Sequence, residues 1–182
     1  GRTFLNNVSL GAYGEVVAQE QYRDHKVVTA FGSLGDLVGP NADPLPLRFT
    51  DGSGTPWSSA VVVLVSNNVY DLAPRPGFGS RATLSDGLLG VVAVAGDRVG
   101  KLVAPVQWST ATFVVESDGP VRVGIDGESV EVPSPVVFRV RPGALRVRIP
   151  RTAPGQSPAA ARYGVVRRTA GRVRALYSPH PD

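Results

Sequence analysis

The sequence predicts a mainly β protein, a β-sandwich of antiparallel strands with one short helix. Valine recurs as the apolar residue, and hydrophobic residues make up 42% of the chain. The chain also contains 21 Gly and 16 Pro, which is typical of many short strands joined by tight turns. Its 182 residues suffice for one domain with a proper core. We expect the sandwich at 1–150 and a Pro/Ala-rich linker with a basic tail at 151–182.

The first predicted strand lies within Thr3–Val17, where Gly11 and Gly14 permit a sharp bend or a close backbone approach. Asn6 and Asn7 interrupt its apolar character. They are satisfied core amides, edge residues or part of a cleft, and the pattern leaves all three open.

The predicted helix covers Arg23 to Val38. Asp24 is a plausible N-terminal cap, and Gly39-Pro40 ends the helix. Its apolar residues recur at three- and four-residue spacing, at Val27, Val28, Phe31, Leu34, Leu37 and Val38. His25 and His180 are the two histidines, which predicts neither a metal cluster nor a Ser-His-Asp arrangement.

A hairpin is predicted next. Leu45–Phe49 forms one strand, Asp51–Gly54 the turn, and Trp57–Ser66 the return. Val61–Val65 is apolar at every position, so we expect it to be buried on both faces at the centre of the sandwich. Asn67-Asn68 then reads as loop, with a cleft role as the alternative.

The middle of the chain alternates loops and strands. Ala73–Ser85 is predicted to be loop, and Gly90–Ala95 a strand. Asp86 is a turn residue or an oxygen ligand for a hard cation such as Mg²⁺. We expect a brief apolar helix or strand at Lys101–Val106 and a further strand at Thr110–Glu116.

The richest pattern runs from Val121 to Ile149. Val121–Ile125 alternates, Asp126-Gly127 is a tight-turn signal, and Val130 and Val132 continue the alternation on the far side. The period extends through Val136, Phe138 and Val140, and Pro142-Gly143 turns the chain toward Leu145, Val147 and Ile149.

Two carboxylates flank this first turn. Asp126 and Glu128 lie on either side of Gly127. The plain interpretation is a turn residue that tolerates positive φ beside a glycine. The sharper hypothesis is that both acids project from a rigid strand end into a cleft where one of them takes a proton.

Composition excludes several classes. Cys is absent, so disulfides and thiolate metal sites are excluded, which is mildly favourable to a cytoplasmic location. No apolar run is long enough for a membrane span, and no signal peptide is visible. Because position 1 is not Met, we expect the chain to begin inside a longer gene product.

Charge is distributed unevenly. The net charge is only +4, but ten arginines follow Phe138 and the sole acid after that point is Asp182. This basic end is either a solvated tail or a surface for anionic lipid or nucleic acid. Aromatic residues are not interleaved with the arginines, so we expect no nucleic-acid partner.

Four phrases in order resemble the C-terminal domain of bacterial diacylglycerol kinase-like lipid kinases, relatives of sphingosine kinases. They are FLNNVSLGAYGEVV, LVSNN, LSDGLLGVV and GIDGESVEVPSPVVFRVRPGALRVRIP. The resemblance runs from about Thr3 to Pro150. It implies a β-sandwich lobe that faces an N-terminal nucleotide-binding lobe across a catalytic cleft.

The resemblance also implies site residues. Its D-G-E motif corresponds to Asp126 and Glu128, with Asp126 as the general base that draws the proton from a lipid hydroxyl as it attacks the γ-phosphate of ATP. Glu128 would position Asp126 or a catalytic Mg²⁺. A structural Mg²⁺ site at the family's D-G-L-L motif maps to the Asp86 carboxylate with the Thr83 and Leu88 carbonyls. Ser85 departs from that pattern, since the family often has a second acid there.

The family's glycine-rich G-G-D-G-T motif, which cradles ATP phosphates, has no counterpart in these residues. The resemblance therefore implies the lipid-side domain of an ATP-dependent kinase, inactive alone, whose partners are the lipid substrate and the nucleotide-binding lobe of the same protein. From the absence of Cys and from the basic end we expect a cytoplasmic protein, peripheral at the inner membrane face, with an anionic membrane surface as a partner. A homodimer is a further expected partner state. The alternatives are a non-catalytic β-sandwich module for lipid binding or dimerisation, and part of an NAD kinase-like enzyme.

Overall fold

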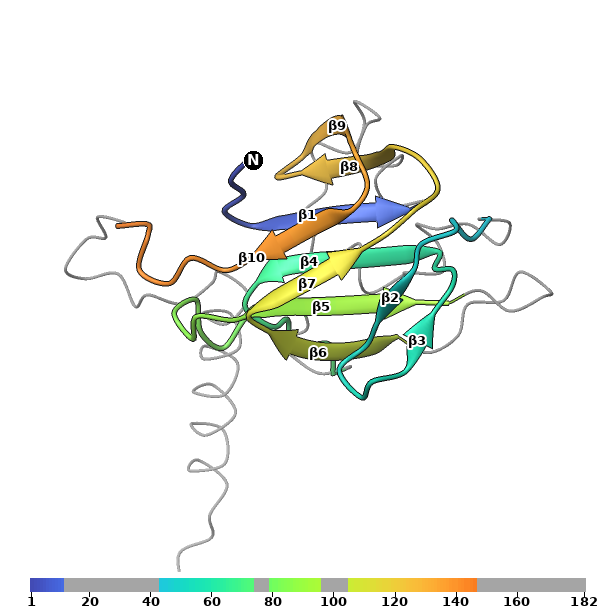
Figure 1. Cartoon of the computed structure of the whole chain (residues 1–182). Helices are drawn as coiled ribbons and strands as arrows, with labels where there is room; N and C mark the ends of the chain where they lie inside the picture. Colours follow the sequence, from blue (N-terminus) through green and yellow to red (C-terminus); the bar gives the residue numbers. More distant parts are fainter. Residues whose placement is uncertain (12–42, 74–78, 96–104, 147–182) are drawn as a thin grey trace, which may run out of the picture.

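A computed structural model describes residues 1–11, 43–73, 79–95 and 105–146 (Figure 1). These residues form antiparallel β-sheets in two layers and contain no helix, which confirms the predicted mainly β class. The predicted helix Arg23–Val38 and the predicted tail 151–182 lie outside the described residues. Within the described ranges, no helix has the length and hydropathy that a membrane crossing requires.

The larger layer is a six-stranded antiparallel sheet. Its strand order does not follow the sequence, because β1 pairs with both β4 and β8. From one edge to the other the strands are β6 (Val106–Thr110), β5 (Leu89–Val94), β4 (Val62–Asn67), β1 (Asn7–Gly11), β8 (Val121–Ile125) and β9 (Glu128–Val132).

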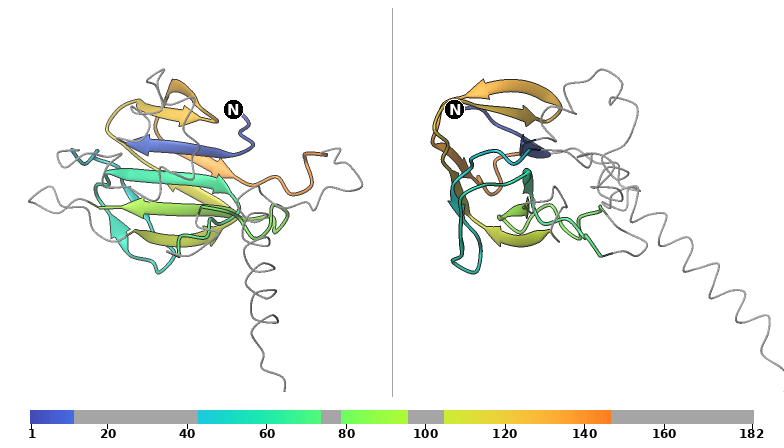
Figure 2. Two further views of the ribbon diagram at one scale, coloured as in Figure 1. Left: turned by 180° about the vertical axis from the view of Figure 1, so that it is seen from behind. Right: turned by 90° about the vertical axis from the view of Figure 1, so that its right-hand side faces the viewer.

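Two small sheets make the second layer, which crosses one face of the large sheet (Figures 1 and 2). One pairs β7 (Thr112–Val115) with β10 (Val136–Arg139), and the other pairs β2 (Phe49–Thr50) with β3 (Pro56–Trp57). One buried cluster joins the two layers, so the predicted sandwich is confirmed.

Aromatic rings fill the interior between the layers. Phe113 packs edge-on against Phe49 and Trp108, with ring centroids 5.5 Å away in each case, and stacks on Phe138 at 6.1 Å. Such pairs favour burial beyond what area alone provides. The rings therefore tie β2, β6, β7 and β10 into one core.

The central strand behaves as its sequence predicts. Every residue of Val61–Val65 is at most 2% exposed. Val63 and Val65 belong to the core cluster with the second layer, while Val62 and Leu64 alternate with them and are equally buried. A strand buried on both faces needs apolar side chains at successive positions, which this run supplies.

Two boundaries differ from the predictions. The expected strand at Thr110–Glu116 is preceded by a full strand, β6, and the chain bends at Ala111 between β6 and β7. The predicted run after Pro142-Gly143 has no strand in its described part, up to Arg146, where Leu145 is 56% exposed. β7 (Thr112–Val115) lies within the expected strand, and the rest of the predicted run, Val147 and Ile149, lies outside the described residues.

Candidate functional site

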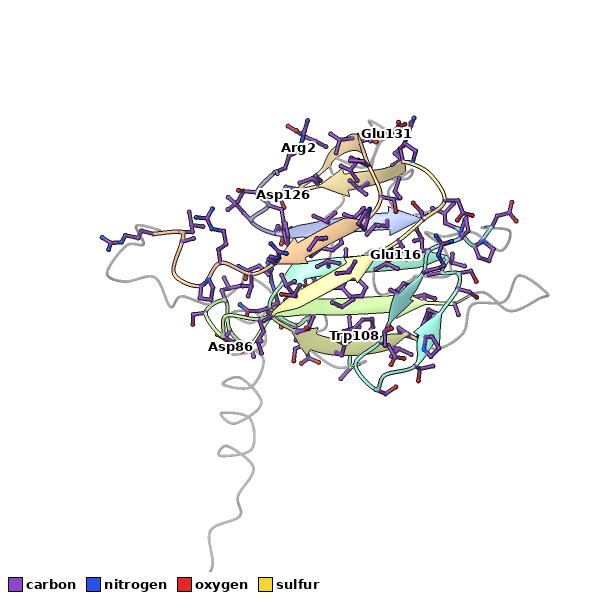
Figure 3. All side chains as sticks on the ribbon, in the orientation of Figure 1. Arg2, Asp86, Trp108, Glu116, Asp126 and Glu131 are labelled. Carbon is purple, nitrogen blue, oxygen red and sulfur yellow. The ribbon has the colours of Figure 1, made fainter. Side chains whose placement is uncertain are left out.

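One end of the six-stranded sheet collects the residues that the sequence singled out. β4 and β8 end there, and β1, β5 and β9 begin there, since neighbouring strands are antiparallel. Asp126 follows β8 and Glu128 opens β9, while Asp86 and Leu88 precede β5. Figure 3 shows Asp126 near the β8 and β9 side of this end and Asp86 toward the β6 side.

The hairpin between β8 and β9 has the predicted register. Ile125 pairs with Glu128, so Asp126 and Gly127 are the two connecting residues. Both have positive φ, 49° at Asp126 and 96° at Gly127. This is the backbone that two-residue hairpins require and that Asp-Gly adopts readily.

The Asp126 side chain does more than permit the turn. Its Oδ2 accepts a hydrogen bond from the Leu5 backbone N–H at 2.7 Å, and its Oδ1 accepts from those of Asn6 and Asn7 at 2.8 and 3.0 Å. The Asp126 N–H in turn donates to the Asn7 carbonyl at 3.0 Å. An ionised carboxylate has about four lone-pair positions, so one remains on Oδ2 for a further donor.

Glu128 lies beside this arrangement and is exposed. Its carboxylate makes no hydrogen bond or ion pair with the described part of the chain. The two acids of the hairpin are therefore different: one is held by three backbone amides, and the other makes no polar contact within the described ranges.

Asn6 connects the Asp126 carboxylate to a cluster of polar side chains. This cluster includes residues that the sequence does not predict to be functional. Arg81 donates to Asn6 Oδ1 at 2.7 Å and to the Asn67 carbonyl at 2.8 Å, and its guanidinium lies over the Tyr70 ring at 4.9 Å. Tyr70 OH donates to Asn6 Oδ1, and Asn7 Nδ2 donates to Tyr70 OH, both at 3.3 Å. Asn6 and Asn7 are thus satisfied structural amides. Arg81 lies in a loop without periodicity, so no sequence signal pointed to it.

Asn68 is the exception among these amides. The sequence predicts it to be loop. It is 2% exposed, has φ 63°, and neither its Nδ2 nor its Oδ1 has a hydrogen-bond partner among the described residues. Its backbone is well held, since its N–H donates to the Leu88 carbonyl at 3.1 Å and its carbonyl accepts from Ser66 Oγ at 2.7 Å.

The predicted magnesium ligands lie together in one short loop before β5. The Asp86 carboxylate is exposed and makes no hydrogen bond or ion pair with the described residues, while the Leu88 carbonyl already accepts the Asn68 N–H. The Thr83 hydroxyl accepts the Ser85 N–H at 3.1 Å. One carboxylate and two carbonyls are hard oxygen donors that fit a Mg²⁺ ion retaining several waters. No group of three or more His, Cys, Asp or Glu comes together in the described ranges.

The metal loop and the hairpin cannot share one ion directly. Asp86 leads into β5 and Asp126 leaves β8, and β4 and β1 lie between these strands. Three strand spacings amount to about 14 Å. A metal at Asp86 would therefore shape the loop rather than contact Asp126.

An apolar cavity of about 830 Å³ lies beside the hairpin, between the two layers. It lies between β1 and β8 on one side and β10 on the other. Leu5 and Ile125 both line it. The backbone N–H of Leu5 donates to the Asp126 carboxylate, and Ile125 directly precedes Asp126 in the chain. Other apolar lining residues include Phe4, Val8, Val123, Val132, Val136, Phe138 and Val140.

No family model and no curated protein matches this sequence. Among solved structures, a diacylglycerol kinase from Bacillus anthracis str. Sterne is similar at 16% identity and a TM-score of 0.41, over 76% of this chain and 47% of that one. Two further structures from the same bacterium, provisionally described as diacylglycerol kinases, match over 75% of this chain at 19% identity. Their TM-scores are 0.43 and 0.46. The chain spans about half the length of these structures, 47–50%.

Proposed function

We propose that this chain is the lipid-side domain of an ATP-dependent lipid kinase of the diacylglycerol or sphingosine type. The D-G-E phrase and the ordered motifs around it suggest the family. The observation that carries the proposal is the position of the Asp126-Gly127 turn beside an apolar cavity of about 830 Å³. Pockets of this size and lining suit the apolar part of a small molecule, with few polar groups fixing its orientation.

In this proposal the acyl part of the lipid lies in the cavity and its hydroxyl reaches the hairpin. Leu5 and Ile125 line the cavity and flank the Asp126 carboxylate, so a hydroxyl leaving the cavity there would meet that carboxylate. The remaining lone pair on Oδ2 would accept the hydroxyl proton, which is the general-base role. The free Glu128 carboxylate would orient the same hydroxyl or a catalytic metal ion. Such positioning is most of what phosphoryl transfer needs from a protein.

Magnesium and ATP complete the proposed reaction. Mg²⁺ supplies charge neutralisation on the phosphates when bound. Asp86, Thr83 and Leu88 would hold a separate, structural Mg²⁺. The nucleotide would be bound mainly by an N-terminal lobe of the same protein, so the present chain alone would be inactive. We propose a cytoplasmic location at the inner face of an anionic membrane, which fits the arginines that follow Phe138.

A non-catalytic lipid-binding module is the second candidate. It is favoured by the three backbone amides on Asp126, because a carboxylate that fixes the chain has a sufficient structural purpose. The cavity suits this candidate equally well. The two candidates differ in whether the protein transfers phosphate to a lipid hydroxyl or only binds the lipid.

The test is lipid phosphorylation by the protein with its proposed nucleotide-binding lobe attached. Purified protein would be given short-chain diacylglycerol in mixed micelles, Mg²⁺ and labelled ATP. Transfer of label to the lipid hydroxyl, and its loss in Asp126→Asn with the fold retained, supports the kinase. Normal turnover in Asp126→Asn removes the base assignment. Lipid binding without transfer supports the module.

A further inference from the structure

The apolar cavity has a basic opening. Three arginines line it, Arg2, Arg139 and Arg141, against a single acid, Glu131. All four are exposed, so they lie at the opening rather than within the cavity. Figure 3 shows Arg2 and Glu131 near the β8 and β9 side of the sheet.

None of these arginines is neutralised by an ion pair in the described ranges, where the one such pair joins Arg48 and Asp118 elsewhere. Two of them flank the end of β10, at Arg139 and two residues beyond it. Arg139 is the last residue of this paired strand. The charged side chains that line the opening are thus three arginines and one glutamate.

The same opening exposes large apolar side chains. Leu5, Val137 and Leu145 all line the cavity and are 55%, 44% and 56% exposed. Exposed apolar side chains therefore lie at the opening together with the arginines. A ligand that satisfies both features has an apolar tail and an anionic head.

We infer that the cavity and its three arginines, here called the arginine rim, bind a phosphorylated lipid, with the acyl chain inside and a phosphate monoester on the rim. A phosphate monoester carries about −1.5 to −2 charges at neutral pH and three acceptor oxygens, which suits arginine forks. The inference deepens the proposed function, on which it rests, by assigning a site for the phosphorylated product.

The test uses the protein of the printed sequence and calorimetric titration with short-chain phosphatidic acid below its micelle concentration. The comparison ligands are diacylglycerol with the same chains and inorganic phosphate. Phosphatidic acid should bind tightest, and salt should weaken its binding but not that of diacylglycerol. If phosphatidic acid and diacylglycerol bind equally well, the arginine rim does not bind the phosphate. If inorganic phosphate binds as tightly as phosphatidic acid, the cavity does not bind the acyl chain.

Variants locate the site. Arg139→Gln with Arg141→Gln should weaken phosphatidic acid at least about tenfold and leave diacylglycerol unchanged, since charge-assisted hydrogen bonds are lost. The matched control is Arg48→Gln with Arg122→Gln, two exposed arginines outside the cavity, and it should change affinity by less than about twofold. Equal losses in the two double variants contradict the assignment.

Two further arms separate other sources of binding. Val132→Phe narrows the cavity from a half-buried position, so it should weaken both lipids and leave inorganic phosphate unchanged. Vesicles of phosphatidylglycerol, which lack a monoester, should bind less than vesicles with phosphatidic acid at equal surface charge, and equal binding overturns the inference. If the parent protein does not bind phosphatidic acid while the protein with its nucleotide-binding lobe phosphorylates lipid, this inference alone is contradicted. If the parent protein binds phosphatidic acid at the arginine rim and no lipid is phosphorylated, the proposed function alone is contradicted.

Discussion

The Asp126 carboxylate accepts the backbone N–H of Asn6 at 2.8 Å, across 120 positions of sequence. The bond links the turn of the β8–β9 hairpin to the segment that enters β1. Leu5 and Asn7 donate to the same carboxylate, so this short segment is fixed by one side chain. The Asn6 side-chain Oδ1 in turn accepts a hydrogen bond from Arg81, which connects the hairpin to the loop before β5. The acid of the D-G-E phrase thus organises one end of the sheet.

Asp126→Asn should loosen that segment. An amide presents one acceptor oxygen where the carboxylate presents two, so at least one of the three N–H groups loses its partner. The free energy of unfolding should fall by about 1–3 kcal/mol. Amide hydrogen exchange at Leu5, Asn6 and Asn7 should accelerate. Asp118→Asn is the control, since Asp118 makes an exposed ion pair that contributes about 0–1 kcal/mol. Unchanged exchange at those amides contradicts the assigned role.

Glu128→Gln separates chemistry from structure. Glu128 is exposed and makes no polar contact with the described residues, so its loss should change the free energy of unfolding by less than about 0.5 kcal/mol. In the protein with its proposed nucleotide lobe, kcat for lipid phosphorylation should fall by about 10²-fold or more if Glu128 orients the reacting groups.

Glu116→Gln is the matched control, because Glu116 is another exposed glutamate and does not line the cavity. It should leave kcat unchanged. If the two variants have the same kcat, Glu128 has no role in turnover.

The β8–β9 hairpin and the central strand were predictable because their signals are local. Asp-Gly sets positive φ at two successive residues, and the unbroken Val61–Val65 run permits burial on both faces. Alternation around the turn then fixes which residues pair. These features depend on a few neighbouring residues, so tertiary context did not override them.

The carboxylate contacts of Asp126 could not be predicted in the same way. They require β1 to lie beside β8, a pairing between strands more than 100 positions apart. The Arg81 contacts depend on the same non-local strand order. No sequence pattern predicts that the Asn68 side-chain amide is buried without a hydrogen-bond partner among the described residues. Local periodicity identifies a strand but not its neighbours, so the polar cluster became visible only in the fold.

Asp86→Asn should abolish the response to magnesium. If the Asp86 carboxylate and the Thr83 and Leu88 carbonyls hold Mg²⁺, millimolar MgCl₂ should raise Tm of the parent protein through binding to the folded state. The variant should show no rise, because Mg²⁺ requires the carboxylate. Asp43→Asn, at an exposed site distant in sequence, should keep the rise. An equal rise in all three proteins contradicts the loop site.

The lowered pKa of Asp51 predicts that the protein loses stability in acid. Hydrogen bonds from Ser53 and then Trp57, with backbone N–H groups of Thr55 and Ser53, lower the pKa of Asp51 from 3.8 to about 2. Because the folded-state pKa is the lower one, the stabilisation is complete above about pH 4 and is lost as pH falls toward 2. The stability difference between the parent protein and Asp51→Asn should therefore shrink over that range. Denaturant titrations from pH 2 to 6 measure it, and a difference independent of pH contradicts the assignment.

Phe113→Ala tests whether the aromatic core holds the two layers together. Phe113 is 4% exposed and contacts rings from β2, β6 and β10, so its truncation leaves a cavity that several strands border. The free energy of unfolding should fall by about 3–5 kcal/mol. Val114→Ala is the matched control on the same strand, since Val114 is 41% exposed and should change stability by less than about 0.5 kcal/mol. Equal effects of the two substitutions would mean that β7 does not pack on the large sheet. Equilibrium unfolding in urea distinguishes these outcomes.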